Sequence, residues 1–150
     1  MLRLSKKADY ALMAMRHLAL QSGRGASSAR EIAEHYDIPV ELLAKVLQRL
    51  VRHGFLQSHQ GTRGGYLLAR QPELISVADV IQAIDGPLTV TACSNEAEAC
   101  DQFEKCNIRD PLWRIKDRIL AALATCTLQD LAEEAAAPVQ PSAEAVLLHR

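Results

Sequence analysis

Two short amphipathic segments joined by a tight turn constrain this sequence more than any other feature. Residues 28–31 (Ser-Ala-Arg-Glu) have the pattern of a capping box, in which the serine and the glutamate each satisfy a free N–H group at a helix start. They predict a short helix over 29–36. Residues 37–39 (Asp-Ile-Pro) then form a turn, and the proline suits the first position of a second helix over 40–53. Two short helices connected in this way form a helix-turn-helix.

A hairpin is expected directly after this pair of helices. Gly54 ends the second helix, because glycine tolerates the left-handed backbone found at helix ends. Strand-like segments at 55–59 and 65–69 flank a glycine-rich turn at 60–64. A helix-turn-helix followed by a hairpin is the winged-helix arrangement. The alternative is an ordinary hairpin that covers a helical core.

Other amphipathic segments precede and follow the winged region. Helical spacing of apolar residues over 4–20 predicts a first helix, with Ser5 as its N-cap. Another short helix is expected over 76–85, where a serine begins it and Gly86 ends it. Residues 89–107 show no sustained periodicity. That stretch is therefore expected to be a loop held by something other than packing.

A long helix is expected to begin at Pro111. Its apolar residues are spaced three and four apart, as in the seam of a coiled coil: Leu112, Ile115, Ile119, Ala122 and Cys126. This stripe favours dimerisation, although a small domain could also use it for its own core. Thr127 begins a final short helix, and the Ala-, Pro- and Ser-rich chain beyond Ala135 is expected to be disordered.

Charge is distributed unevenly along the chain. Residues 1–70 carry 11 Lys and Arg against 5 Asp and Glu, a net charge of +6, whereas residues 71–150 carry 6 against 13, a net charge of −7. The basic first half predicts a polyanionic partner, and scattered surface charge is the alternative. There is no apolar run of about 18 residues and no signal-peptide pattern. We therefore expect a cytoplasmic protein that does not associate with membranes.

The outward face of the second helix of the helix-turn-helix is the expected DNA-contacting surface, because such a helix presents polar residues to the major groove. Lys45 and Gln48 are the best candidates for base contacts, since lysine donates to guanine and glutamine can pair with adenine. Arg49 and Arg52 are expected on phosphates, and Arg63 in the wing is expected in the minor groove. The remaining predicted contacts are Lys6, Ser28, Arg30 and Glu41. For each of these residues, a solvated surface position is the alternative.

Three of the four cysteines lie in one acidic loop and together span only 14 residues: Cys93, Cys100 and Cys106. A disulfide framework is not expected in a cytoplasmic chain. Zinc sites normally use closely spaced cysteine pairs, whereas this wider spacing suits an iron–sulfur cluster. Zinc and redox-reactive thiols remain alternatives on spacing alone. Cys126, on the apolar stripe, is interpreted as a buried free cysteine.

Several motifs agree in order and spacing with one known family. They are residues 1–12 (MLRLSKKADYAL), residues 31–33 (Glu-Ile-Ala), residues 64–68 (GGYLL), and the three cysteines ahead of Leu112-Trp113. In these motifs the chain resembles the Rrf2 family of winged-helix transcription regulators, which includes IscR- and NsrR-type proteins. The resemblance runs from Met1 to about Glu133. It is closest to the subgroup that regulates the SUF iron–sulfur assembly system.

The resemblance implies a homodimer built on the long helix, with one iron–sulfur cluster (2Fe-2S or 4Fe-4S) per subunit in the cysteine loop. IscR-like members use a histidine shortly before the tryptophan as fourth ligand, and that place holds Asp110 here, beside Arg109. NsrR-like members use an aspartate from the first helix of the partner subunit, which corresponds to Asp9. Asp9 is therefore the candidate fourth ligand, and Asp110 is its competitor. Gln60 stands where the family has its usual wing arginine, so Arg63 is expected to take that role.

The sequence thus predicts a regulator that binds double-stranded promoter DNA and represses the SUF operon while clusters are plentiful. Within the same class, the alternative is a nitric oxide-sensing repressor. In another class, the alternative is a metal- or cluster-carrier protein, which would need no helix-turn-helix. An enzyme is not expected, because four of the five histidines are scattered along the sequence and have no paired nucleophile, and the fifth, His149, lies in the tail; the four are His17, His35, His53 and His59.

These inferences give a mainly α fold, namely a winged helix-turn-helix with a short two-stranded wing and a long C-terminal dimerisation helix. The expected parts of the chain are a DNA-binding domain at 1–88, a cluster-binding cysteine loop at 89–110, the dimerisation helix and short final helix at 111–135, and a disordered tail at 136–150.

Overall fold

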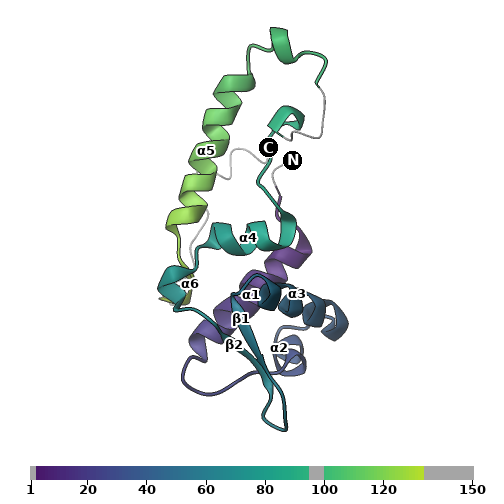
Figure 1. Ribbon diagram of the computed structural model, residues 1–150, viewed down its shortest axis with the longest axis vertical. Coiled ribbons are helices and arrows are strands. Elements are labelled where there is room, and N and C mark those ends of the chain that lie inside the picture. Colours follow the sequence, from purple (N-terminus) through teal and green to yellow (C-terminus); the bar gives the residue numbers. More distant parts are fainter. Residues whose placement is uncertain (1–2, 95–99, 134–150) are drawn as a thin grey trace, which may run out of the picture.

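The computed structural model describes residues 3–94 and 100–133. The helices and strands are, in order, α1 (Lys6–Leu20), α2 (Ala29–His35), α3 (Val40–Arg52), β1 (Leu56–His59), β2 (Gly65–Leu68), α4 (Val77–Asp85), α5 (Arg109–Thr125) and α6 (Leu128–Glu133). Three 3-10 turns complete them: η1 (Pro72–Leu74), η2 (Ala92–Ser94) and η3 (Phe103–Lys105). Figure 1 shows a winged-helix body from which α5 extends, with the cysteine segment alongside. The predicted mainly α winged fold is confirmed, and the tail at 136–150 lies outside the described residues.

Local capping determines where the helices of the helix-turn-helix begin. The Ser28 hydroxyl accepts the Glu31 N–H at 3.1 Å, and the Glu31 carboxylate accepts the Ser28 N–H at 2.7 Å, which confirms the predicted capping box. Tyr36 is the C-cap of α2, and His53 is the C-cap of α3. Both helices therefore end one residue earlier than expected. Pro39 is the N-cap of α3 rather than its first helical residue.

The wing is a two-stranded antiparallel sheet that is fastened to the start of α2. Leu56 of β1 lies opposite Leu68 of β2. Ser27 and Tyr66 exchange two backbone hydrogen bonds, of 3.2 and 2.8 Å. Gly65 has a φ of +153°, and a Cβ there would lie 2.4 Å from the Ser27 carbonyl. Glycine is required at this position because the two backbones approach so closely.

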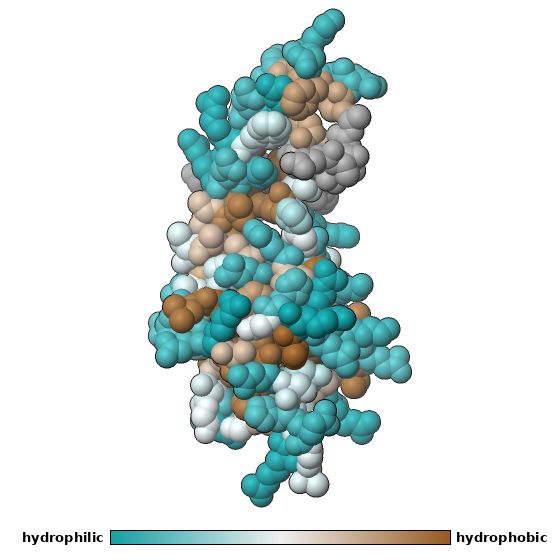
Figure 2. All heavy atoms as spheres, viewed as in Figure 1, coloured by the Kyte–Doolittle hydropathy of each residue, from teal (hydrophilic) through white to brown (hydrophobic). Residues whose placement is uncertain are grey.

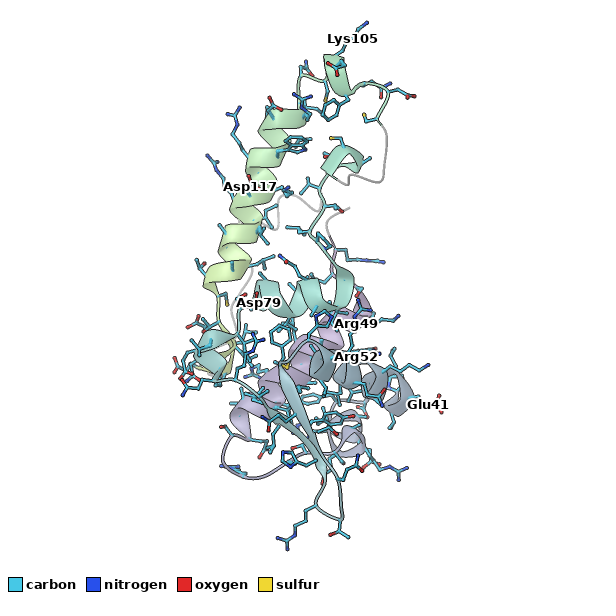
Figure 3. All side chains as sticks on the ribbon, in the orientation of Figure 1. Glu41, Arg49, Arg52, Asp79, Lys105 and Asp117 are labelled. Carbon is cyan, nitrogen blue, oxygen red and sulfur yellow. The ribbon has the colours of Figure 1, made fainter. Side chains whose placement is uncertain are left out.

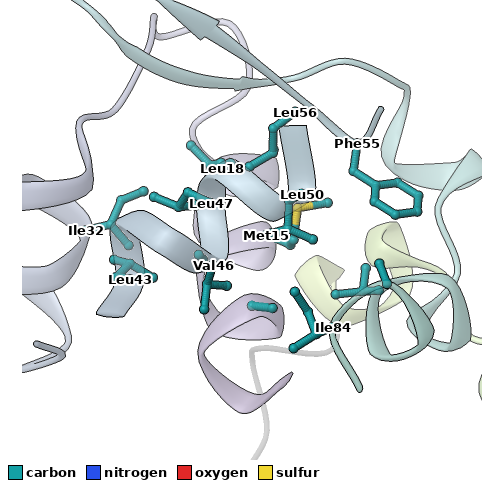
Figure 4. Packing of buried hydrophobic residues seen from close by; sticks show 14 of the residues in the cluster. Met15, Leu18, Ile32, Leu43, Val46, Leu47, Leu50, Phe55, Leu56 and Ile84 are labelled. Atoms are coloured by element: carbon teal, nitrogen blue, oxygen red, sulfur yellow. The ribbon is translucent and has the colours of Figure 1, made fainter. Parts of the chain in front are cut away.

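One apolar core lies beneath the helix-turn-helix and joins α1, α3, β1 and α4 (Figure 4). Met15, Leu47 and Leu50 are fully buried in it. The buried residues of α3 recur at helical spacing, and each large side chain contributes about 1.5–3 kcal/mol when removed from water. This burial fixes the rotation of α3 about its axis. The opposite face of α3 is consequently held toward solvent.

The last turn of α4 is bonded to two other helices. Asp85 accepts a hydrogen bond from the Ser5 N–H at 3.1 Å and another from the Ser5 hydroxyl, at the start of α1. Arg49 of α3 donates through Nε to the Ala83 carbonyl at 2.7 Å. Gly86 then ends α4 with a φ of +82°. The chain that leads to the cysteines therefore leaves the body at a turn that is tied to both α1 and α3.

Helix α5 projects from the body and contacts α4. It begins at Arg109, two residues before the expected start at Pro111, and none of its residues is buried. Ile115 is 45% exposed. Figure 2 shows apolar surface among the charged side chains in this part of the molecule. Among the described residues, no helix has the length and apolar character needed to cross a bilayer.

Candidate nucleic-acid interface and cysteine site

One stripe on the outer face of α3 carries four of the predicted DNA contacts. Glu41, Lys45, Gln48 and Arg52 are all exposed, and their spacing of four, three and four places them on one side of a helix. In Figure 3, Glu41 lies at the outer edge of the winged body and points away from it. The stripe is therefore presented to solvent by the same packing that buries the apolar face of α3.

Two grooves flank this stripe. A groove of about 370 Å³ between α3 and the wing is lined by Gln48, Val51, Arg52, Ser58, Gln60 and Tyr66. A groove of about 360 Å³ between α3, the start of α1 and the end of α4 is lined by Lys7, Leu42, Lys45, Val46, Arg49, Arg52 and Ile84. Four cations line the second groove, whereas amide and hydroxyl groups predominate among the polar groups of the first.

The two grooves differ in the part of DNA that they suit. Clustered lysine and arginine side chains match phosphates, and neutral groups that donate and accept hydrogen bonds match base edges. Ser58 and Gln60, which line the wing groove, were not among the predicted contacts. Lys7 counted only toward the positive charge of residues 1–70. No local sequence signal marks Ser58 or Lys7, and Gln60 was noted only for its place in the wing. The packing of α3 against its neighbours brings all three to the stripe.

Arg49 has a structural contact that its sequence position did not indicate. It was interpreted as an outward residue that contacts phosphate. In the structure its Nε is engaged by the Ala83 carbonyl, although its side chain also lines the cationic groove. Arg49 therefore links α3 to α4.

The other predicted contacts lie on separate elements, and none of them lines either groove. Ser28 caps α2, and the exposed Arg30 lies in the first turn of that helix. Arg63 is exposed in the turn of the wing. Lys6, at the start of α1, is 79% exposed and pairs with Asp9 at 3.7 Å. Arg30, Arg63 and Lys6 are thus exposed cations on elements other than α3.

Two histidines that are distant in sequence meet in the fold. The rings of His17 and His35 lie 5.5 Å apart, and His17 Nδ1 lies 3.0 Å from the Tyr36 hydroxyl. Burial lowers the pKa of His17, and the charge of His35 lowers it further, against an opposing effect of Glu31. This cluster packs α1 against the end of α2, so these histidines are partly structural.

The three loop cysteines lie between α4 and α5. Cys93 is in η2, Cys100 precedes η3, and Cys106 follows it; all three are half-buried free thiols. Among residues 3–94 and 100–133, no three His, Cys, Asp or Glu side chains gather closely enough to hold a metal ion. Within these residues the single chain therefore gathers neither the three cysteines with one another nor Asp9 or Asp110 with them. Cys126 is the half-buried C-cap of α5, about 25 Å from its start by helix geometry.

Arg109 lies at the start of α5 and contacts several residues of the cysteine segment. Its Nε donates to Asp110 Oδ1 at 2.8 Å, and Nη1 donates to the Phe103 carbonyl at 3.0 Å. The guanidinium lies over the rings of Phe103 and Trp113, 4.4 and 5.5 Å from their centroids. The hydrogen bond to Arg109, and then its charge, hold the pKa of Asp110 below its usual range.

The donors in this segment fit a thiophilic metal centre. The hydrogen bond that Arg109 donates to Asp110 raises the pKa of Arg109, and the charges of Cys106 and Cys93 raise it further. The indole N–H of Trp113 is buried without an acceptor among the described residues. Soft thiolates, a compensating cation and a free donor are the groups that an iron–sulfur cluster uses.

A winged helix with a cationic recognition helix is the architecture of a DNA-binding transcription regulator. The Rrf2 family model, described as an iron-dependent transcriptional regulator, matches residues 4–134. The chain therefore belongs to the Rrf2 family, whose members are transcription regulators and not enzymes.

Curated relatives and solved structures agree with this family. The HTH-type transcriptional regulator IscR of Xenorhabdus nematophila is 35% identical over 131 residues, covering 87% of this chain and 79% of the relative. The IscR of Escherichia coli is 34% identical, with coverages of 87% and 80%. CymR, the global cysteine regulator of B. subtilis, has a TM-score of 0.76 and 31% identity, covering 89% of this chain and 98% of that one. The T. potens IscR structure has a TM-score of 0.72 and 29% identity, covering 93% and 94%.

Proposed function

We propose that this protein is a cytoplasmic, dimeric repressor of the SUF iron–sulfur assembly operon, controlled by an iron–sulfur cluster on Cys93, Cys100 and Cys106. The observation that carries the proposal is the set of three half-buried free thiols in the segment between α4 and α5. Fold similarity alone does not indicate a cluster, because CymR, the global cysteine regulator of B. subtilis, shares the fold. The cysteines and the IscR relatives together support it.

We propose the same division of the chain into four parts as the sequence predicts, except that α5 begins at Arg109. A cluster would supply a rigid, redox-sensitive junction for the three thiolates. The chain's own residues would then convert the state of the cysteine segment into a change at the DNA. The segment leaves α4 directly after Asp85, which is bonded to α1, and Ala83 of the same turn is bonded to Arg49 of α3. A shift in the last turn of α4 would therefore alter the position of α3.

Anaerobic purification followed by DNA binding tests the function as a whole. The protein from iron-replete cells is expected to be brown and to contain iron and sulfide in equal numbers. Its affinity for SUF promoter DNA should change when the cluster is removed. A cluster carrier would bind iron and sulfide without preferring promoter DNA over random DNA, and that result would contradict the proposal.

The α3 stripe gives a sharper prediction for DNA recognition. Lys45→Ala and Gln48→Ala are each expected to weaken promoter binding by about 1–3 kcal/mol and to relax the preference at one base pair. Arg52→Ala and Lys6→Ala should weaken binding to all sequences and lower the salt slope by about one, because these cations contact phosphates. Affinities for promoter and random DNA, measured over a range of salt concentrations, distinguish the two classes.

A cation at the far end of the molecule provides the control. Lys105 is exposed in η3, and Figure 3 places it far from the labelled residues of α3. Lys105→Ala should leave promoter affinity and the salt slope unchanged. Equal weakening of promoter and random DNA by Lys45→Ala would show that Lys45 does not contact bases.

The fourth ligand is the subject of a separate prediction. Asp9 is on α1 and its side chain is 39% exposed, so a partner subunit can reach it. Asp110 is held more closely, because Arg109 pairs with it at 2.8 Å, whereas Lys6 pairs with Asp9 at 3.7 Å. We therefore expect Asp9→Ala to leave the fold and dimer intact but to accelerate cluster bleaching in air, whereas Asp110→Ala should have little effect. A wild-type bleaching rate for Asp9→Ala together with faster bleaching for Asp110→Ala would assign the ligand to Asp110.

A further inference from the structure

The segment between Cys100 and Cys106 is attached to α5 mainly through one side chain. Phe103, within this segment, is contacted by Arg109 in two ways: its carbonyl accepts from Nη1 at 3.0 Å, and its ring lies 4.4 Å beneath the guanidinium. The ring of Trp113, one turn further along α5, lies 6.4 Å from that of Phe103. The guanidinium thus joins a residue between two of the cysteines to the first turns of the long helix.

We propose that Arg109 is a positioning residue for the cluster: through its contacts with Phe103 and Trp113 it clamps η3, which lies between Cys100 and Cys106, to the start of α5. The inference rests on the proposed function, because it assumes that the cysteines hold a cluster. It assigns a role to a residue that stands beside the competing ligand Asp110 and does not itself coordinate metal.

The charge of Arg109 matters because the proposed ligands are anionic. Three thiolates and a carboxylate bring four negative charges together, and a cation bound to the segment between Cys100 and Cys106 offsets part of their mutual repulsion. The pKa of Arg109 is raised by the hydrogen bond to Asp110 and further by Cys106 and Cys93. Arginine cannot lose its proton in the working pH range, so this charge remains constant.

The geometry of Arg109 matters separately from its charge. A guanidinium donates in a planar fork and stacks on aromatic rings at the same time, which an ammonium group cannot do. Here the fork bonds Asp110 and Phe103, while the flat face covers the rings of Phe103 and Trp113. Arg109→Lys therefore keeps the charge and removes the clamp. Arg109→Ala removes both.

The clamp can be tested on the protein without its cluster. Trp113 is the single tryptophan of the chain, so its fluorescence reports this site alone. In Arg109→Ala and in Arg109→Lys, acrylamide should quench Trp113 more strongly, and trypsin should cut after Lys105 at least threefold faster than in wild type. Lys105 is the cleavage site in the trypsin assay, so it cannot be substituted there. The control for that assay is Arg114→Ala, which removes an exposed cation of α5. Wild-type quenching and wild-type cleavage in Arg109→Ala would overturn the clamp.

The effect on the cluster is measured as the rate of iron loss to a chelator under anaerobic conditions. Arg109→Ala should lose iron about 10-fold faster, in line with other residues that support metal ligands. Arg109→Lys should fall between Arg109→Ala and wild type, and Lys105→Ala should match wild type. Iron loss at the wild-type rate in Arg109→Ala would overturn the positioning role. A wild-type protein that takes up no iron and sulfide would instead contradict the proposed function, while the fluorescence and cleavage results would still decide the clamp.

Discussion

Replacing Cys93, Cys100 or Cys106 singly by alanine is expected to abolish the bound iron and sulfide. Each thiolate supplies one coordination bond to the cluster, and a methyl group cannot replace it. All three cysteines are half-buried and lie outside the apolar core, so these substitutions should leave the helical content and the stability of the winged body unchanged. Iron and sulfide analysis, with an absorption spectrum of each anaerobically purified variant, measures the effect.

The fourth cysteine provides a matched control for this experiment. Cys126 lies at the other end of α5 from Cys106, at a distance that no ligand bond can bridge within one subunit. Cys126→Ala should therefore retain a full complement of iron and sulfide. Wild-type preparations that contain stoichiometric zinc and no sulfide would contradict the cluster and favour the zinc alternative.

The parts of the fold that depend on local signals could be predicted from the sequence. The capping box at Ser28 and the apolar spacing of α3 act within a few residues, and the structure reproduces both helices to within one residue at each end. The start of α5 was placed two residues late, because Pro111 was taken as the first helical residue. In the structure it lies in the first turn, where a proline has no N–H group to satisfy.

The features that the sequence did not reveal depend on contacts between distant residues. The bond from Arg49 to Ala83 spans 34 positions, and nothing near Arg49 in the sequence distinguishes it from a phosphate contact. The packing of His17 against His35 has the same origin, since it needs α1 and α2 to cross at that point. Such pairs become visible only when the packing of the helices is known.

The cysteine site could be predicted only in part from the sequence. Spacing along the chain was enough to single out Cys93, Cys100 and Cys106. The role that we propose for Arg109 could not be inferred in this way, because it depends on how η3 folds back on α5. The identity of the fourth ligand is harder still, since the candidate Asp9 would come from a second copy of the chain.

The exposed apolar residues of α5 indicate that this helix needs a partner to cover them. A lone helix of this length is only marginally stable in water, and α5 has no buried residue of its own. Ile115 lies in the predicted seam and is 45% exposed. A second copy of α5 packed against this seam would cover the apolar stripe. It would also set the separation of the two α3 helices, which fixes the half-site spacing on DNA.

Ile115→Glu is therefore expected to separate the dimer. Burial of an isoleucine is worth about 1.5–3 kcal/mol. Both subunits of a two-fold symmetric dimer carry the substitution, so the loss is doubled. The dimerisation constant should therefore fall about 10²–10⁴-fold. Because Ile115 is already exposed in the single chain, the winged body should keep its stability. Ala124→Glu adds the same charge on the opposite side of α5 and should leave a dimer. Sedimentation over a range of concentrations measures both, and an Ile115→Glu protein that remains dimeric at micromolar concentration would show that the seam lies elsewhere.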